Sequence, residues 1–173
     1  MNGKGDSIGK FELSRQVLFL DFDGVLHRLA AVRTRRGIAS TSPSIRLFEF
    51  APILVECLAP YGEVKIVLST SWVHHLGYQR AKNALPPVLS ERVVGATYHS
   101  KYFDAEMWPS RARGTQILRY VLTHRLTSWL AIDDEIVGFG DYLSHVVICD
   151  ENVGLGDLRT QDSLRTGLSE QFG

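Results

Sequence analysis

Three groups of polar residues in the sequence each follow a short apolar run. In chain order these groups are Asp21 and Asp23, then Ser69, Thr70 and Ser71, then Asp133 and Asp134. Buried carboxylates are costly to remove from water, so a cluster of them requires a compensating positive charge. Carboxylate oxygens are ligands that Mg²⁺ prefers, and this ion also shares phosphate oxygens with its substrates. If the three groups meet in space, they predict a Mg²⁺ site for a phosphorylated substrate.

The stretch from Asp21 to Gly24, with the sequence D-F-D-G, fits covalent transfer of a phosphoryl group. The Asp21 carboxylate is a competent nucleophile and can form an aspartyl-phosphate. Residues two apart in an extended chain point the same way, so Asp23 can protonate the leaving oxygen and then activate water. Gly24 lets the chain turn sharply beneath both acids. A hydroxyl from residues 69–71 can bind a phosphoryl oxygen, and a cation is expected to neutralise charge in the transition state.

The apolar runs that lead to these groups are typical of short strands buried in a parallel sheet. Strands are predicted within 16–24, 63–72, 128–135 and 145–156, with a shorter one near Val93 and Val94. Helices are predicted within 52–62, 113–126 and 162–172, and before the double proline at 86–87. This alternation predicts a three-layer α/β/α Rossmann-like domain with a mostly parallel sheet. The polar groups then lie at the carboxyl ends of the strands, the edge where such sheets bind ligands.

The composition predicts one globular domain over 15–173, preceded by a flexible N-terminal arm over 1–14. Lysine plus arginine and aspartate plus glutamate each number 19, so the net charge argues neither for nor against a polyanionic partner. No apolar run approaches the roughly 20 residues of a membrane span, and the first residues lack the apolar core of a secretory signal. Cys57 and Cys149 lie in apolar contexts and are predicted to be buried free thiols. We therefore expect a cytoplasmic protein without a membrane partner.

Three motifs resemble those of the haloacid dehalogenase-like (HAD) phosphohydrolases. "FLDFDGVL" resembles the first motif, "IVLSTSW" the second and "WLAIDDE" the fourth, and the resemblance extends over residues 17–150. Together with "ERVVGAT" and "CDENVGL", they look most like a small bacterial HAD subgroup associated with Swiss-army-knife RNA-repair systems. The resemblance implies a Mg²⁺-dependent phosphomonoesterase that acts through an aspartyl-phosphate, with RNA-repair proteins as candidate partners.

The resemblance also implies a role for each matching residue. Asp21 would be the nucleophile and Asp23 the general acid and base. Thr70 best matches the hydroxyl of the second motif, with Ser69 and Ser71 as alternates. The metal ligands would be the Asp21 carboxylate, the main-chain carbonyl of Asp23, Asp134, and Asp133 as a further ligand or an orienting residue.

The third motif departs from the family pattern. The family usually places a lysine near the start of the helix before the last acidic strand, whereas this helix opens with "SRARGTQI". Arg113 is the first choice for the missing cation, then Arg111, then Lys101. Arginine can neutralise charge, but it presents a planar fork where lysine presents a point charge. The absent lysine motivates an alternative hypothesis, a HAD-fold phosphate-binding or regulatory module with little or no turnover.

The chain between the motifs is too short for a large cap domain, which in this family implies an open site and large substrates such as nucleic-acid ends. A nucleotide is not excluded. Gly24, His27 and Trp72 are predicted to lie near the substrate, although Trp72 fits a core position equally well. The polar stretch 27–44 is predicted to form an irregular flap beside the site. Its arginines, which are Arg28, Arg33, Arg35 and Arg36, fit either a solvated loop or contacts with further phosphates of the substrate.

Other interpretations of the same residues are weaker. A calcium loop also contains D-x-D-G, but with Gly24 in its sixth position Phe19 and Ala30 would occupy positions that require acids. Asp133 and Asp134 could instead cap the start of a following helix. A phospho-acceptor receiver domain has its acidic pair after the first strand, whereas here the pair comes last.

Overall fold

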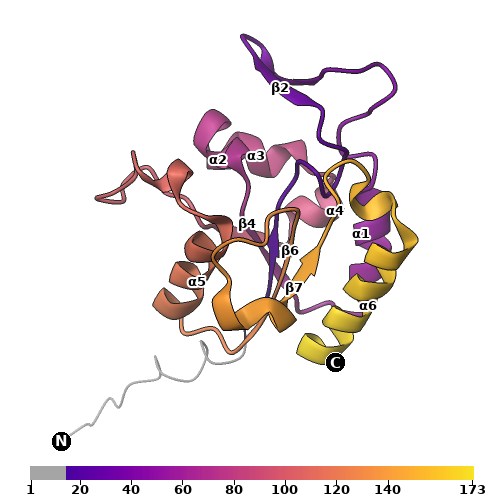
Figure 1. Ribbon diagram of the computed structural model, residues 1–173, viewed down its shortest axis with the longest axis vertical. Helices are drawn as coiled ribbons and strands as arrows, with labels where there is room; N and C mark the ends of the chain where they lie inside the picture. Colours follow the sequence, from indigo (N-terminus) through magenta and orange to yellow (C-terminus); the bar gives the residue numbers. More distant parts are fainter. Residues whose placement is uncertain (1–14) are drawn as a thin grey trace, which may run out of the picture.

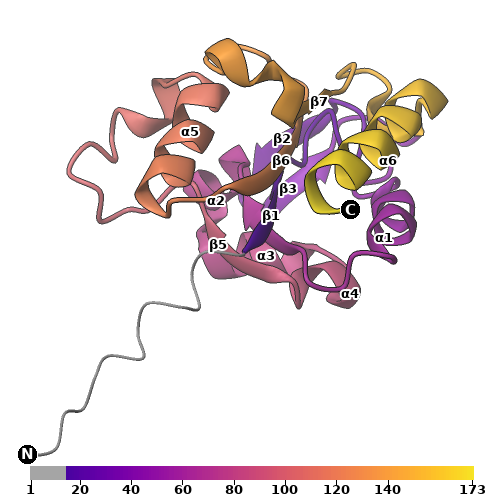
Figure 2. The same cartoon turned by 90° about the horizontal axis from the view of Figure 1, so that it is seen from below.

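The computed structural model describes residues 15–173, and the flexible arm predicted over 1–14 lies outside them. Its centre is a five-stranded parallel sheet in the order β5-β4-β1-β6-β7. Helices cover both faces of this sheet, as Figures 1 and 2 show, so the predicted three-layer α/β/α architecture is confirmed. The strands of the sheet are β1 (Gln16–Leu20), β4 (Lys65–Leu68), β5 (Val93–Ala96), β6 (Ser128–Asp133) and β7 (Val146–Ile148).

Helices lie between these strands and after the last of them. The α-helices are α1 (Ala51–Leu58), α2 (Ser71–Leu76), α3 (Tyr78–Ala84), α4 (Pro87–Ser90), α5 (Arg113–Thr123) and α6 (Leu158–Phe172). Short 3₁₀ helices lie at η1 (Trp108–Ser110), η2 (Gly140–His145) and η3 (Gly154–Gly156). Figure 2 shows α5 on one side of the sheet and α1 with α6 on the other. None of the helices in the described part of the chain is long and apolar enough to cross a membrane.

Side-chain alternation along β1 explains the two cores. Leu18 and Leu20 belong to a cluster that includes buried residues of α1 and α6, whereas Val17 and Phe19 pack with Ile117 and other residues of α5. Successive residues of a strand point to opposite faces, so a continuous apolar run is what a strand needs when both of its faces are covered. Cys57 and Cys149 are buried and free, as predicted.

The register of β1 brings the three polar groups together. Leu20 pairs with Leu68 of β4 on one side and with Ile132 of β6 on the other. The next residues are Asp21, Ser69 and Asp133, which therefore leave the sheet side by side. The prediction that the polar groups share the carboxyl edge of the sheet is confirmed.

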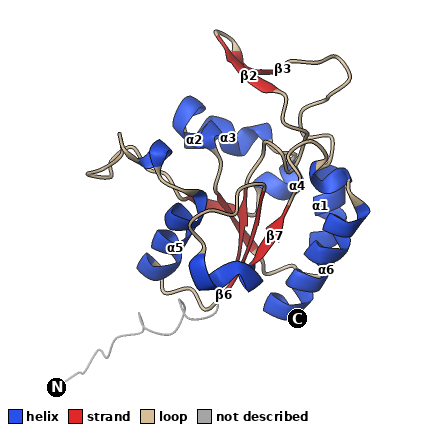
Figure 3. Ribbon diagram, in the orientation of Figure 1, coloured by secondary structure: helices blue, strands red, loops and turns tan. Residues whose placement is uncertain are grey.

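Several elements differ from the sequence-based predictions. The stretch 27–44 is not irregular throughout, because β2 (Ala31–Thr34) and β3 (Gly37–Ser40) form an antiparallel hairpin that projects beyond the helices in Figures 1 and 3. The helix α2 was not predicted; it follows β4 and begins at Ser71, the last of the three hydroxyl residues. The last helix begins at Leu158 rather than at 162, because the Asp157 side chain accepts a hydrogen bond from the Thr160 N–H and caps the helix there.

Candidate active site

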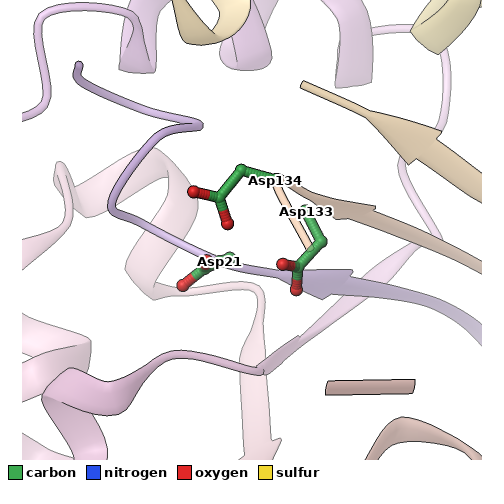
Figure 4. A group of neighbouring side chains, drawn as sticks. All are labelled: Asp21, Asp133 and Asp134. Carbon is green, nitrogen blue, oxygen red and sulfur yellow. The ribbon is translucent and has the colours of Figure 1, made fainter. Parts of the chain in front are cut away.

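Three carboxylates converge where β1 and β6 end. Each of Asp21, Asp133 and Asp134 offers a ligand oxygen, and these oxygens lie within 4.8 Å of one another. Figure 4 shows the three side chains grouped around one point. Asp21 and Asp133 are 3% and 0% exposed, so the cluster is largely withdrawn from water.

Burial makes this cluster electrostatically costly. It raises the pKa of Asp21 to about 7, an effect that Arg113 opposes and Asp134 adds to. Burial, followed by the charge of Asp21, also raises the pKa of Asp133 well above its ordinary range, and burial raises the pKa of Asp134. Three acids with hard oxygen donors face one buried arginine. The oxygen donors and the excess of negative charge therefore fit a divalent cation such as Mg²⁺.

Gly24 allows Asp134 to complete the cluster. Its φ of +72° lies in the left-handed region that residues with a side chain rarely adopt. A Cβ atom at this position would also overlap the Asp134 carboxylate. The glycine is therefore required for the turn after Asp23 and for the space that the third carboxylate occupies.

Arg113 supplies a positive charge inside the cluster. Its Nη2 lies 3.5 Å from Oδ2 of Asp21, and its Nε lies 3.1 Å from Oδ2 of Asp133. The side chain is only 13% exposed. Burial lowers the pKa of Arg113, but Asp21 and then Asp133 more than offset this, so the pKa stays above its ordinary value.

The start of α5 is docked onto the loop after β6, which explains how Arg113 reaches the acids. The Arg113 N–H donates to Oε1 of Glu135 (3.1 Å), and the Gly114 N–H donates to the Val137 carbonyl (2.9 Å). A Cβ atom at Gly114 would collide with the backbone of Gly138 and Phe139. Sequence reasoning missed the part that Glu135 plays, although it directly follows the acidic pair.

The hydroxyl groups lie at the end of β4 and the start of α2. Ser69 is fully buried, and its Oγ has no hydrogen-bond partner among the described residues. Thr70 is the N-cap of α2, where its Oγ1 accepts the Trp72 N–H at 3.4 Å. Ser71 is exposed. Thr70, Ser71 and Arg113 line a cavity of about 100 Å³, so the structure brings the predicted hydroxyl and the predicted cation to one space.

The other two candidate cations lie apart from the carboxylates. Nη2 of Arg111 pairs with Oδ2 of Asp104 at 3.0 Å, and its side chain, which is 43% exposed, lines the same cavity as Arg113. Lys101 is exposed and forms no ion pair with any carboxylate in the part of the chain that the structure describes. Of the three, Arg113 alone contacts the carboxylate cluster.

His27 and Trp72 lie behind Asp23 rather than on an open surface. His27 is 0% exposed and Trp72 is 3% exposed, so neither offers surface to a substrate in this structure. Each instead contacts the Asp23 carboxylate at 2.9 Å. The structure therefore places both rings against Asp23 and leaves them almost no exposed surface for a direct contact with substrate.

The hairpin carries positive charge close to this site. Arg28 is paired with Glu49 at 2.9 Å, but Arg33, Arg35 and Arg36 are exposed and have no carboxylate partner within 15–173. Burial and then His74 and Arg33 lower the pKa of His75, whereas Asp23 raises it. His75 is thus within electrostatic reach of both the hairpin and Asp23.

The comparison with protein families assigns the chain. The model of a family described as the HAD domain in Swiss Army Knife RNA repair proteins matches residues 17–159. No curated protein and no solved structure matches the chain. The family match covers the carboxylate cluster and the five strands of the sheet except Gln16, and it confirms the predicted subgroup. The chain therefore belongs to the family of HAD domains found in Swiss Army Knife RNA repair proteins.

Proposed function

We propose that this protein is a Mg²⁺-dependent phosphomonoesterase that acts through an aspartyl-phosphate on Asp21. The observation that carries the proposal is the buried cluster of Asp21, Asp133 and Asp134 with Arg113 against it. Membership in a HAD family supports phosphohydrolase chemistry at the level of the superfamily. The metal, the intermediate and the substrate are our inference from the residues.

Asp21, Asp133 and Asp134 would hold the ion, with the main-chain carbonyl of Asp23 as a further oxygen ligand. Bound Mg²⁺ would neutralise the carboxylates and polarise the phosphate group. The charge balance supports this assignment, because one arginine cannot offset three acids, two of which are buried.

The first chemical step would transfer the phosphoryl group to the protein. A carboxylate oxygen of Asp21 attacks phosphorus, and the bond between phosphorus and the ester oxygen breaks. Asp23 gives its proton to that oxygen, so that the leaving group departs as a neutral alcohol. Arg113 and the Thr70 hydroxyl, which line one cavity, would stabilise the phosphoryl oxygens, with Ser69, Ser71 and Arg111 as the neighbouring candidates.

The second step would release inorganic phosphate. Asp23, now a carboxylate, takes a proton from water, and the water oxygen attacks phosphorus. The bond between phosphorus and Asp21 breaks, which returns Asp21 to its carboxylate form. Asp23 regains its proton, so the cycle consumes one water molecule and leaves the protein unchanged.

A nucleotide or a nucleic-acid end is the proposed substrate. The arginines Arg33, Arg35 and Arg36 on the hairpin, which have no carboxylate partner among the described residues, support a substrate with further phosphates. The description of the family as part of RNA repair proteins supports RNA ends and RNA-repair partners. The cytoplasmic location of this protein stays a prediction.

The test is phosphate release from p-nitrophenyl phosphate with Mg²⁺, with EDTA, and with Asp21→Asn. We expect metal-dependent turnover that the substitution abolishes. The same assay on RNA and DNA oligonucleotides with 5′- or 3′-phosphates, and on nucleotides, would then identify the substrate. Full activity in Asp21→Asn would contradict the assignment of the nucleophile.

One observation favours a second candidate, a phosphate-binding module without turnover. Arg113 contacts Asp21 as well as Asp133, and an arginine bound to the nucleophile can hold it away from phosphorus. This candidate would gain support if the protein bound Mg²⁺ and a phosphate analogue such as vanadate but released no phosphate from any ester in the panel.

A further inference from the structure

Both oxygens of the Asp23 carboxylate are held by hydrogen bonds from buried rings. The Trp72 Nε1–H donates to Oδ2, and His27 Nε2 lies against Oδ1, each at 2.9 Å. The tautomer of His27 follows from its other nitrogen, because Nδ1 accepts the Phe48 N–H at 3.1 Å. A neutral imidazole that accepts at Nδ1 carries its proton on Nε2, so His27 donates to Asp23.

The two donors are themselves fixed. The rings of Phe22 and Phe48 pack edge-on against the Trp72 ring, with centroids 5.4 and 5.2 Å away, and Phe48 also packs against the His27 ring at 5.2 Å. Phe48 has a φ of 60°, a left-handed conformation that residues with a side chain rarely adopt. The same residue donates its N–H to Nδ1 of His27, so the backbone conformation of Phe48 sets where that donor points.

The Asp23 side chain is not fixed by the carboxylate cluster, so the hydrogen bonds from Trp72 and His27 are what orient it. Its side chain is 21% exposed, and it lies outside the buried cluster of three acids. A general acid must hold its proton within hydrogen-bond distance of the leaving oxygen, and a displacement of about 1 Å can cost about 100-fold in rate. Each Asp23 oxygen keeps a second lone pair for that proton, since Trp72 and His27 use only one each.

We propose that His27 and Trp72 are positioning residues that orient Asp23 for proton transfer, and that Phe48 sets the tautomer of His27 for this purpose. This inference rests on the proposed function. His27 and Trp72 would affect the protonation of the leaving oxygen by Asp23, but not the attack of Asp21 on phosphorus.

Three variants separate orientation from packing. Trp72→Phe keeps a ring and removes the donor. His27→Asn keeps an acceptor near the position of Nδ1 and removes the donor to Asp23, whereas His27→Gln places an amide donor near the position of Nε2. The thermal unfolding midpoint of each variant identifies any that fail to fold.

The diagnostic measurement is kcat/KM for two phosphate monoesters with Mg²⁺. p-Nitrophenolate leaves without a proton, whereas the alkoxide of glycerol 2-phosphate needs one. We expect Trp72→Phe and His27→Asn to lower kcat/KM for glycerol 2-phosphate by about 10-fold or more, and for p-nitrophenyl phosphate by less than about 3-fold, since general acid catalysis contributes about 10²–10⁴ in total. His27→Gln should recover most of the loss. Equal losses on both esters, or none on either, would overturn the proposal.

A second measurement tests the contacts without using activity. In ¹H–¹⁵N NMR spectra the Trp72 indole signal, identified by its loss in Trp72→Phe, should shift on Asp23→Ala. The Trp108 indole, which is buried without a partner in 15–173, serves as the reference that should stay in place. The ¹⁵N shifts of His27 should show the Nε2–H tautomer. A Trp72 signal unmoved by Asp23→Ala would refute the inference even in an active enzyme, whereas wild-type protein that hydrolyses neither ester would refute the proposed function.

Discussion

The stability of the metal-free protein should fall as the pH rises through about 7, and Mg²⁺ should abolish that fall. Burial raises the pKa of Asp21 to about 7, against 3.8 for a free side chain. A raised folded-state pKa means that the folded chain binds a proton which the unfolded chain has already lost. The associated stability is complete below the unfolded pKa and is lost as the pH rises through the folded pKa.

The magnitude follows from the interval between the two values. Between pH 5 and pH 7 the unfolded Asp21 is ionised while the folded one remains protonated. About two pH units at about 1.4 kcal/mol each give a loss of about 3 kcal/mol in the free energy of unfolding by pH 8. Asp133 has the same direction of shift and adds to the loss.

The assay is urea unfolding at pH 5 and at pH 8, with EDTA and with Mg²⁺, for the wild-type chain and Asp21→Asn. In EDTA the free energy of unfolding of the wild type should fall between pH 5 and pH 8. This fall should exceed that of the variant by about 3 kcal/mol, because the amide in the variant does not titrate. Mg²⁺ should stabilise the wild type more at pH 8 than at pH 5, because it binds the ionised carboxylates. Equal pH dependence in the two proteins, or a Mg²⁺ effect independent of pH, would refute the electrostatic argument.

Three further predictions test other parts of the site. Gly24→Ala should lower the thermal unfolding midpoint in EDTA, because the φ of +72° at this position is costly for alanine. It should also reduce the stabilisation by Mg²⁺, because a Cβ atom would displace the Asp134 carboxylate. A Mg²⁺ affinity equal to that of the wild type, measured by calorimetry, would contradict this. Arg113→Met should reduce kcat for p-nitrophenyl phosphate by about 100-fold or more, since it removes a positive charge from the transition state, and Arg113→Lys should retain more activity. The combined variant Arg33→Gln, Arg35→Gln and Arg36→Gln, which neutralises the hairpin, should raise KM for a phosphorylated oligonucleotide. The slope of log KM against log salt concentration should fall by up to about 0.7 for each lost phosphate contact, and KM for p-nitrophenyl phosphate should stay unchanged.

The sequence was sufficient to predict the sheet and the meeting of the polar groups, because both follow from local patterns. Continuous apolar runs identify strands that are covered on both faces, and parallel pairing of β1 with β4 and β6 then aligns the strand ends. The hairpin was missed because its two strands have only four residues each and no buried position, so neither shows the alternation that marks a half-buried strand.

The support of Asp23 could not be predicted for a different reason. It depends on contacts between residues distant in the chain, since the partners of Asp23 and His27 are Trp72 and Phe48, 49 and 21 positions away. It also depends on a left-handed φ at a phenylalanine, a conformation for which sequence offers no signal. Only the spacing of Asp23 and His27, four residues apart, was visible beforehand.

Arg113 is the residue proposed for the cation that the resemblance to the HAD motifs predicts as a lysine. Its Nη2 and Nε face two different carboxylates, Asp21 and Asp133, at 3.5 and 3.1 Å. A lysine ammonium is a point charge and would have to favour one of them, whereas the guanidinium fork spans both. Arg113 thus lies between Asp21, which is proposed as the nucleophile, and Asp133. We therefore expect Arg113→Lys to keep the positive charge but to lose one of these two contacts.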